Sequence, residues 1–328
     1  MANITPNHIF SINNEADFES VSLEVFRFQA SACPVYREYI QLMRIDPLSV
    51  KRIDKIPFLP VSFFKEHLIY SGEGEPEMTF VSSGTTGTIQ SRHAIRSLSV
   101  YEESLSRDFT LFYGDPSEYA FFGLLPSYIE REGSSLIYMV NKLIELSGNH
   151  FGGFYLHDYD ALLKTVCKAR ETGLKVFLIG VTFALLDLAE KHPCDMHDVI
   201  IMETGGMKGR REELIREELH SILSKAFNVS EIHSEYGMTE LLSQAYSKGN
   251  GLFSTPPWMR VLIRDSHDPL SHTFENGASG GISVIDLANL WSCSFIATSD
   301  LGRMYDNGMF EVLGRFDNAD IRGCNLLV

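Results

Sequence analysis

Val81-Ser-Ser-Gly-Thr-Thr-Gly-Thr-Ile-Gln90 is the stretch around which the rest of the sequence can be organised. An apolar run, Met78 to Val81, precedes it and His93 to Ile95 follows, so the pattern predicts a strand, a tight loop and a second strand. Glycines let the backbone approach a ligand closely, and hydroxyl residues can donate to phosphate oxygens. The predicted phosphate-binding residues are Ser82, Ser83, Gly84, Thr85, Thr86 and Gly87. A polar hairpin turn is the structural alternative.

Two glycine-containing segments downstream have the composition of ligand-binding turns. Glu203-Thr-Gly-Gly-Met-Lys-Gly209 follows a predicted strand and precedes a predicted helix, which is the ligand-facing edge of an open α/β sheet. Tyr236-Gly-Met-Thr-Glu240 combines an aromatic ring, a glycine, a hydroxyl and a carboxylate. The candidate binding residues are Gly205, Gly206, Lys208, Tyr236, Gly237, Thr239 and Glu240. The alternatives are a strand-to-helix turn for the first segment and a helix N-terminus capped by Thr239 for the second.

Two further segments, Thr298-Ser-Asp-Leu-Gly302 and Gly314-Arg-Phe-Asp317, contribute a carboxylate and a guanidinium. The Asp300 carboxylate can accept two hydroxyl protons, and the Arg315 guanidinium can donate in a fork. Gly277-Ala-Ser-Gly-Gly281 fits the Gly-x-Ser-x-Gly pattern of hydrolases, but a polar loop precedes it and a strand follows, so we reject a nucleophile elbow.

The pattern of strands and helices predicts an α/β fold with a largely parallel sheet. Helical spacing predicts two helices between residues 14 and 45, with Pro34 in the first turn of the second, and further helices at 99–112, 134–146, 159–172, 183–191 and 210–227. Strands are predicted at 119–125, 150–155, 175–181, 199–203 and 231–234 and, in a smaller β-rich region, at 260–264, 281–286, 294–298 and 309–313. Residues 56–61 hold two prolines and should be an extended connector.

Composition describes an ordinary globular protein with an acidic balance. The chain has 328 residues, 44% of them hydrophobic, and a formal net charge of −15, which disfavours nucleic acid and anionic membrane surfaces as partners. The N-terminus lacks the basic and apolar regions of a signal peptide, and polar residues interrupt the longest weakly charged span, 280–299. Five widely spread cysteines without a Cys-x-x-Cys pair favour reduced thiols. We therefore expect a cytoplasmic protein without membrane insertion.

Taken in order, the segments at 82–87, 203–209, 236–240, 298–302 and 314–317 resemble those of the adenylate-forming (acyl-AMP) ligases. The resemblance implies the N-terminal domain of that fold and the use of ATP and Mg²⁺. It places Gly205 and Gly206 beside adenine and the acid, and Tyr236 against adenine. It also places Thr239 on the α-phosphate, Glu240 on magnesium, and Asp300 and Arg315 on the ribose.

The end of the chain resembles the acyl-protein synthetase (LuxE) branch of that superfamily. Only fourteen residues follow Gly314, where most ligases continue into a domain with a catalytic lysine. Asp320-Ile-Arg-Gly-Cys-Asn-Leu-Leu-Val328 instead resembles the short branch, whose members transfer an acyl group from acyl-AMP to a cysteine. The resemblance implies a fatty acid substrate, acylation of Cys324 and an acyl-reductase or acyl-carrier protein partner. Thr88 or Gln90 stands where the phosphate loop of the wider ligase family often has a lysine, and Arg92 or Lys208 could substitute for that lysine.

On this reading, residues 1–249 are an α/β region that binds nucleotide and acid, 250–314 are a β-rich subdomain of the same domain, and 315–328 are a truncated hinge and tail. Two other functions stay open. The same fold could pass its acyl group to CoA, a carrier protein or another small acceptor. A chain without catalysis could bind nucleotide and act through a partner, although such a scaffold would need no magnesium carboxylate.

Overall fold

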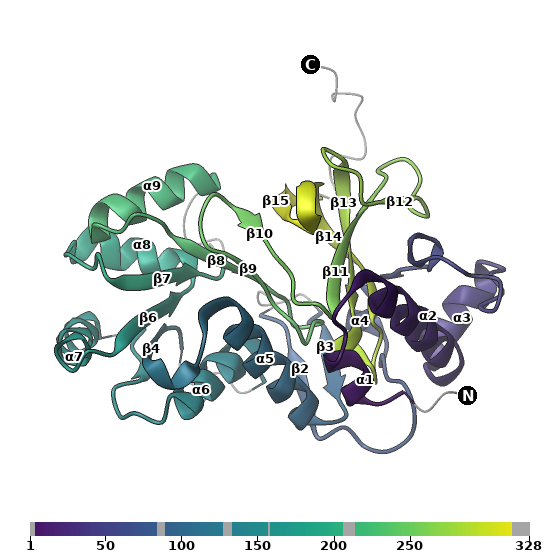
Figure 1. Cartoon of the computed structure of the whole chain (residues 1–328), viewed down its shortest axis with the longest axis horizontal. Helices are drawn as coiled ribbons and strands as arrows, with labels where there is room; N and C mark the ends of the chain where they lie inside the picture. The colour runs from purple at the N-terminus through teal and green to yellow at the C-terminus, as the bar shows by residue number, and fades with distance from the viewer. Residues whose placement is uncertain (1–3, 84–88, 127–132, 157, 206–213, 317–328) are drawn as a thin grey trace.

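Two β-sheets and a separate hairpin organise this computed structural model, which describes residues 4–83, 89–126, 133–156, 158–205 and 214–316 (Figure 1). Figure 1 shows one sheet with its helices on the left and the other sheet on the right, with the N-terminal helices beside it. The described core forms two clusters of buried apolar side chains, one around each sheet. Among the described residues, no helix is both long and apolar enough to cross a membrane.

The first sheet has six strands in the order β5-β4-β6-β7-β8-β9, all parallel except β9. Its strands are β4 (Tyr119–Leu124), β5 (Gly153–Phe154), β6 (Lys175–Gly180), β7 (Val199–Glu203), β8 (His233–Tyr236) and β9 (Ala245–Ser247). Every residue of β4 is buried, as expected of a central strand covered on both faces. The predicted parallel sheet is confirmed, although the segment at 150–155 contributes only two strand residues.

Helices connect these strands in the alternation that the sequence predicts. They are α5 (Leu98–Tyr113), α6 (Ser135–Ser147), α7 (Tyr159–Glu171), α8 (Thr182–Lys191) and α9 (Arg216–Phe227). Local signals set several ends: the Asp158 side chain accepts a hydrogen bond from the Ala161 amide at the start of α7. Gly148 and Asn228 adopt left-handed conformations after α6 and α9.

The second sheet is antiparallel and has the order β10-β15-β14-β13-β11-β12, with β1 added in parallel to β14. Its strands are β1 (Leu59–Pro60), β10 (Leu252–Phe253), β11 (Met259–Arg264), β12 (His272–Thr273), β13 (Ser279–Asp286), β14 (Phe295–Met304) and β15 (Phe310–Arg315). The predicted extended connector is confirmed, because residues 59–60 lie in this sheet. Ser279 begins strand β13, whereas the serine of a nucleophile elbow lies between a strand and a helix. The rejection of a nucleophile elbow is therefore confirmed. Gly280 is needed for close strand packing, since a Cβ there would lie 2.3 Å from the Arg264 carbonyl oxygen.

The N-terminal helices pack on the second sheet. They are α1 (Pro6–Phe10), α2 (Glu15–Ala32), α3 (Pro34–Leu42) and α4 (Phe63–Glu66); short 3₁₀ turns lie at Ile53–Lys55, Pro116–Glu118, Leu287–Asn289 and Asp306–Gly308. The Phe26 ring of α2 meets the edge of Phe295 in β14, with 5.9 Å between centroids. Buried Gln29 donates to the carbonyls of Asn289 and Leu290. Two amphipathic helices with proline at the start of the second were predicted here and are confirmed.

Strands β2 (Met78–Val81) and β3 (Arg92–Ile95) form the separate hairpin. Both predicted strands are therefore confirmed.

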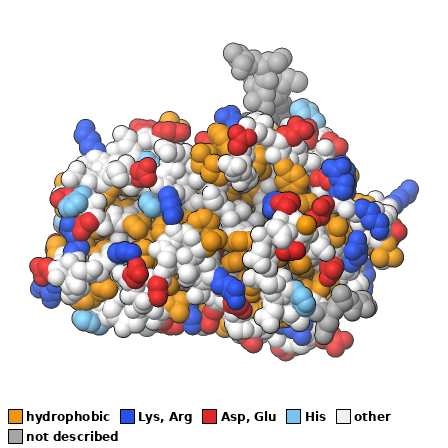
Figure 2. Space-filling model, in the orientation of Figure 1, with side chains coloured by type: hydrophobic (Ala, Val, Ile, Leu, Met, Phe, Trp, Pro, Cys, Tyr) orange, Lys and Arg blue, Asp and Glu red, His pale blue; other side chains and the backbone are white. Residues whose placement is uncertain are grey.

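Acidic and basic side chains are interspersed on the face of the molecule drawn in Figure 2, so neither sign of charge dominates that face.

Candidate functional site

Hydrogen bonds between Ser82 and the start of β3 close the base of the predicted phosphate loop. Its hydroxyl oxygen accepts from the Ser91 amide at 2.9 Å, its own amide donates to the Ser91 carbonyl at 3.0 Å, and its carbonyl accepts from the Gln90 side chain at 2.8 Å. Ser83 is exposed. The other predicted loop residues, Gly84, Thr85, Thr86 and Gly87, lie outside the described residues. Ser82 thus has a structural role in addition to any role in binding.

Strand β8 runs directly into a tight turn that carries two of the predicted site residues. The Leu241 amide donates to the Met238 carbonyl at 3.1 Å, which places Thr239 and Glu240 at the two central positions of a β-turn. The alternative of a helix capped by Thr239 is wrong, because residues 237–244 are not helical. Short polar turns at the carboxyl end of a sheet are typical of ligand sites.

Glu240 is buried, with only 6% of its surface exposed. Burial raises the pKa of its carboxyl group, and a hydrogen bond with the Ser91 side chain and the charges of Lys65 and Arg315 partly oppose that rise. Both charges therefore lie within electrostatic reach of this carboxyl group. Lys65 itself is exposed on α4.

Tyr236, Asp300 and Arg315 come together from three strands. The Tyr236 hydroxyl donates to one Asp300 carboxylate oxygen at 2.8 Å, and the Arg315 Nε donates to the other at 3.2 Å. Asp300 and Arg315 face each other across the β14–β15 pair, so sheet register produces their contact. The sequence predicted that both residues contact the ribose, which stays a prediction; neither the Asp300–Arg315 ion pair nor the contact with Tyr236 was predicted.

The Tyr236 ring packs against two aromatic rings of the second sheet, which stack on each other. Its centroid is 6.0 Å from that of Phe253 and 5.4 Å from that of Phe310, both in edge-on arrangements. Burial, together with the neighbouring Asp300 carboxylate, raises the pKa of its hydroxyl well above the usual value. The hydroxyl is therefore a proton donor to Asp300 at neutral pH. Stacking of this ring on adenine stays a prediction.

Gly237 makes room for a protein side chain. A Cβ at this position would lie 2.2 Å from the Glu235 Oε1 atom, a distance that no real contact allows. The sequence predicts close approach of a ligand here, whereas in this structure the Glu235 carboxyl group occupies that space. Burial, and secondarily the charge of Glu203, raises the pKa of Glu235 to about 8.

At the end of β7, the turn that begins with Glu203 is held by its own side chain. The Glu203 carboxylate accepts from the Gly205 amide at 2.7 Å, and Gly205 has a φ of +70° that favours glycine. Gly206 and Lys208 lie outside the described residues. His220 of α9 lies 3.4 Å from the Ser234 hydroxyl and 3.9 Å from the Glu203 carboxylate.

His220 also lines a cavity of about 360 Å³, which is within the size range of small-molecule sites. Its walls come from α9, from residues 230–232 and 249–251, and from Glu311 of β15. The Arg216 guanidinium, at the start of α9, donates to the Val312 carbonyl and so links α9 to β15. The cavity is therefore lined by α9 and by segments next to β8 and β9 of the first sheet, together with β15 of the second.

The described residues contain no group of three or more His, Cys, Asp or Glu side chains that could hold a metal ion by themselves. Glu240 alone could supply one carboxylate, and Mg²⁺ commonly binds through one or two carboxylates with phosphate oxygens and water. The Asp300 carboxylate accepts two hydrogen bonds from described side chains, Tyr236 and Arg315, whereas a carboxylate can accept about four. The residues present thus fit a nucleotide whose phosphates supply most metal ligands.

Several residues that hold this site were not predicted from the sequence, above all His93, Ser91 and Asn289. His93 is a buried histidine with two hydrogen bonds. These contacts join positions far apart in the chain, so no local pattern could reveal them. Cys324 lies outside the described residues; the four described cysteines, Cys33, Cys167, Cys194 and Cys293, are free.

Comparison with known proteins finds similarity in both sequence and fold. Residues 6–110 match the family described as acyl-protein synthetase, LuxE. A Photorhabdus luminescens protein described as a long-chain-fatty-acid–luciferin-component ligase is 42% identical over 66 residues, which are 20% of this chain and 56% of that protein. The match thus spans about half the length of the curated relative.

Solved structures extend the likeness to the fold. ATP-bound MatB from Rhodopseudomonas palustris has a TM-score of 0.55 and 16% identity, over 74% of this chain and 49% of that chain. A 2-hydroxyisobutyryl-CoA ligase in complex with 2-HIB-AMP and CoA has a TM-score of 0.69 and 12% identity, over 94% and 70% of the two chains. These likenesses confirm the predicted adenylate-forming-ligase fold.

Proposed function

Because residues 6–110 match the family described as acyl-protein synthetase (LuxE), we propose that this chain activates a carboxylic acid with ATP. In this reaction a carboxylate oxygen attacks the α-phosphorus of ATP, the bond to the β-phosphate oxygen breaks, and pyrophosphate leaves. The product is an acyl-adenylate. The observation that carries the proposal is the assembly of Tyr236, Asp300 and Arg315 beside the turn of Thr239 and Glu240.

Each of these groups has a chemical task in the proposed reaction. Asp300 would accept hydrogen bonds from the ribose hydroxyls while Tyr236 and Arg315 hold its orientation. The Thr239 hydroxyl would donate to the α-phosphate, and Glu240 would contribute a carboxylate to Mg²⁺. Magnesium would neutralise the charge that develops on the phosphates.

The acid is proposed to be a fatty acid, because the Photorhabdus relative is described as a long-chain-fatty-acid ligase. In the second step the Cys324 thiolate would attack the acyl carbonyl carbon and AMP would leave, which gives a protein-bound thioester. The Phe316 amide donates to the Ser299 carbonyl at 2.8 Å, next to Asp300. Cys324 is eight positions after Phe316, and a fully extended chain of eight steps reaches about 26 Å. An acyl-reductase or an acyl-carrier protein would receive the acyl group.

Acid-dependent exchange of labelled pyrophosphate into ATP, measured over a panel of fatty and aryl acids, tests the first step. We expect exchange with at least one fatty acid and a large loss in Glu240→Gln, because the amide is a poor magnesium ligand. Glu38→Gln, which changes an exposed glutamate of α3, is the matched control. Equal exchange in Glu240→Gln and the parent would refute the metal role, and no exchange with any acid would refute adenylation.

The second step is tested by incubation with ATP, Mg²⁺ and a radiolabelled acid that supports exchange. Hydroxylamine-labile label should appear on the parent protein and be absent from Cys324→Ser, while pyrophosphate exchange persists in that variant. Label that remains on Cys324→Ser would exclude this cysteine as the acceptor. Rapid acylation of CoA without self-acylation would support transfer to a small acceptor instead.

A further inference from the structure

In the turn at Met238–Leu241, the carbonyl oxygens of the two central residues, Thr239 and Glu240, accept no hydrogen bond from the turn itself. Side chains from elsewhere in the chain supply both partners. The Thr239 carbonyl accepts from His93 Nδ1 at 2.9 Å, and the Glu240 carbonyl accepts from Asn289 Nδ2 at 2.7 Å. His93 and Asn289 are both buried. Two successive peptide groups that carry the proposed phosphate and magnesium ligands are therefore fixed by buried donors.

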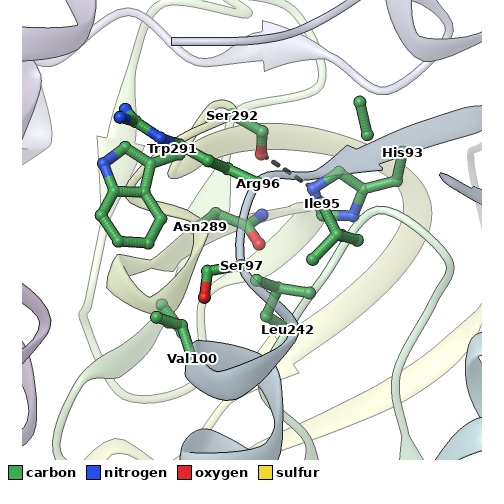
Figure 3. A pocket seen from close by; sticks show the side chains of 11 residues that line it. His93, Ile95, Arg96, Ser97, Val100, Leu242, Asn289, Trp291 and Ser292 are labelled. Atoms are coloured by element: carbon green, nitrogen blue, oxygen red, sulfur yellow. Dashed lines mark hydrogen bonds between the residues drawn. The ribbon is translucent and has the colours of Figure 1, made fainter. Parts of the chain in front are cut away.

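The surroundings of His93 define which nitrogen carries the proton. A carbonyl oxygen can only accept, so Nδ1 is the protonated nitrogen, and Nε2 then accepts from the Ser292 hydroxyl at 2.8 Å (Figure 3). The Ser292 carbonyl accepts in turn from the Ser71 hydroxyl at 2.6 Å. The Phe64 ring of α4 packs against the imidazole at 5.5 Å and 86°. Burial lowers the pKa of His93 to about 4, so the ring is neutral at pH 7.

A small cavity borders the second donor. It has a volume of about 10 Å³, enough for roughly one water molecule, and Figure 3 shows His93, Asn289 and Ser292 among the side chains around it. The Asn289 Oδ1 atom is buried and has no hydrogen-bond partner among the described residues. Its Nδ2 also donates to the Cys293 carbonyl at 3.2 Å. A water at this position would complete the hydrogen bonds of the asparagine.

Strand β3 joins the turn to the base of the proposed phosphate loop. Ser91, just before β3, donates its amide to the Ser82 hydroxyl, and its side chain forms a hydrogen bond with the Glu240 carboxyl group. His93, two residues later, holds the Thr239 carbonyl. One short segment thus sets the distance between the loop and the turn.

We propose that His93 is a positioning residue, which holds the Thr239–Glu240 turn against strand β3 in the geometry that phosphate and magnesium binding require. The catalytic part of this inference rests on the proposed adenylation. Active sites lose rate steeply when a ligand group moves by about 1 Å, and a turn outside a helix or strand has few backbone bonds of its own to prevent such movement.

Two isosteric substitutions separate positioning from simple core packing. In His93→Asn the side-chain amide can occupy the place of Nδ1 and donate to the Thr239 carbonyl, whereas in His93→Gln it reaches the place of Nε2 and leaves that carbonyl without a partner. His267→Gln, at an exposed histidine, is the control. We measure hydrogen exchange of the amides in 238–243, pyrophosphate exchange over a range of Mg²⁺ concentrations, and unfolding by urea.

We expect hydrogen exchange of the amides in 238–243 to be on the order of tenfold faster in His93→Gln than in the parent, since one hydrogen bond contributes about 1 kcal/mol to stability. The maximal rate of pyrophosphate exchange should fall by at least a similar factor, and His93→Asn should restore much of both losses. Equal losses in the two variants, in proportion to their urea midpoints, would overturn the proposal, as would unchanged amide protection in His93→Gln. A parent without pyrophosphate exchange would refute the proposed adenylation, and amide protection would still decide whether His93 holds the turn.

Discussion

Replacement of Glu235 by glutamine should make the protein more stable at neutral and alkaline pH but not at acidic pH. The pKa of the Glu235 carboxyl group is 4.5 as a free side chain and about 8 in the folded protein, because burial disfavours its charged form and the charge of Glu203 adds to that effect. Between these values the folded state keeps a proton that the unfolded chain releases. The free energy of unfolding therefore falls as pH rises from about 4.5 to about 8, by up to about 1.36 kcal/mol per pH unit.

The full pKa shift of Glu235 corresponds to an upper limit of about 5 kcal/mol in the free energy of unfolding. Part of the side chain is exposed, which weakens the desolvation, so we expect about 2 to 3 kcal/mol between pH 5 and pH 8. Glutamine resembles the protonated acid in shape and does not titrate, so Glu235→Gln should lose this slope. Contributions from distant titrating groups are common to both proteins and cancel in the difference.

Urea unfolding of the parent and of Glu235→Gln at pH 5, 6, 7 and 8 measures this difference. The two proteins should be close in stability at pH 5, and the variant should gain steadily up to pH 8. Glu38→Gln, at an exposed position, should follow the parent at every pH. A difference that stays constant over this range would show that Glu235 ionises normally in the folded protein and would refute the reasoning.

Three further predictions concern neighbouring groups. Lys65→Ala should lower the rate of pyrophosphate exchange several-fold and shift the acidic limb of its pH–rate profile to higher pH, because the Lys65 charge favours the ionised form of Glu240. Lys65→Arg should restore both the rate and the profile. A pH–rate profile that Lys65→Ala leaves unchanged would contradict this prediction. Asp300→Ala should raise the apparent KM for ATP about tenfold through loss of about 1 to 3 kcal/mol of charge-assisted hydrogen bonding; an effect on melting temperature alone would make it a structural residue. Gly237→Ala should destabilise the protein by about 1 to 3 kcal/mol in urea, and the cost should shrink in a Glu235→Ala background if the clash with that carboxyl group is its cause.

Much of the fold could be predicted because its signals are local. Strands such as β4 and β6 are continuous apolar runs, and helices such as α2 and α3 show regular spacing and a proline at a start. The residues of the turn after β8 were predicted from their chemical types alone. The shape of that turn was not, because Thr239 is equally suited to a helix cap and to a tight turn.

The contacts that hold the candidate site could not be predicted in the same way. His93 and Thr239 are 146 residues apart, and Tyr236 and Asp300 are 64 apart. Only the folded arrangement of hairpin, parallel sheet and antiparallel sheet brings them within hydrogen-bond distance. Gly237 illustrates a different limit: glycine was expected to admit a ligand, and the structure shows the neighbouring Glu235 side chain in that space.

The bond between Gln29 in α2 and Ser294 before β14 has a consequence for synthesis on the ribosome. These residues are 265 positions apart, and translation at about 5 to 20 residues per second separates their appearance by roughly 13 to 50 s. During that interval Phe26 and Leu59 have none of their strand β14 partners, because residues 295–297 have not yet been made. The N-terminal helices of the nascent chain therefore expose apolar surface for tens of seconds, which makes them the segment where a chaperone would bind first.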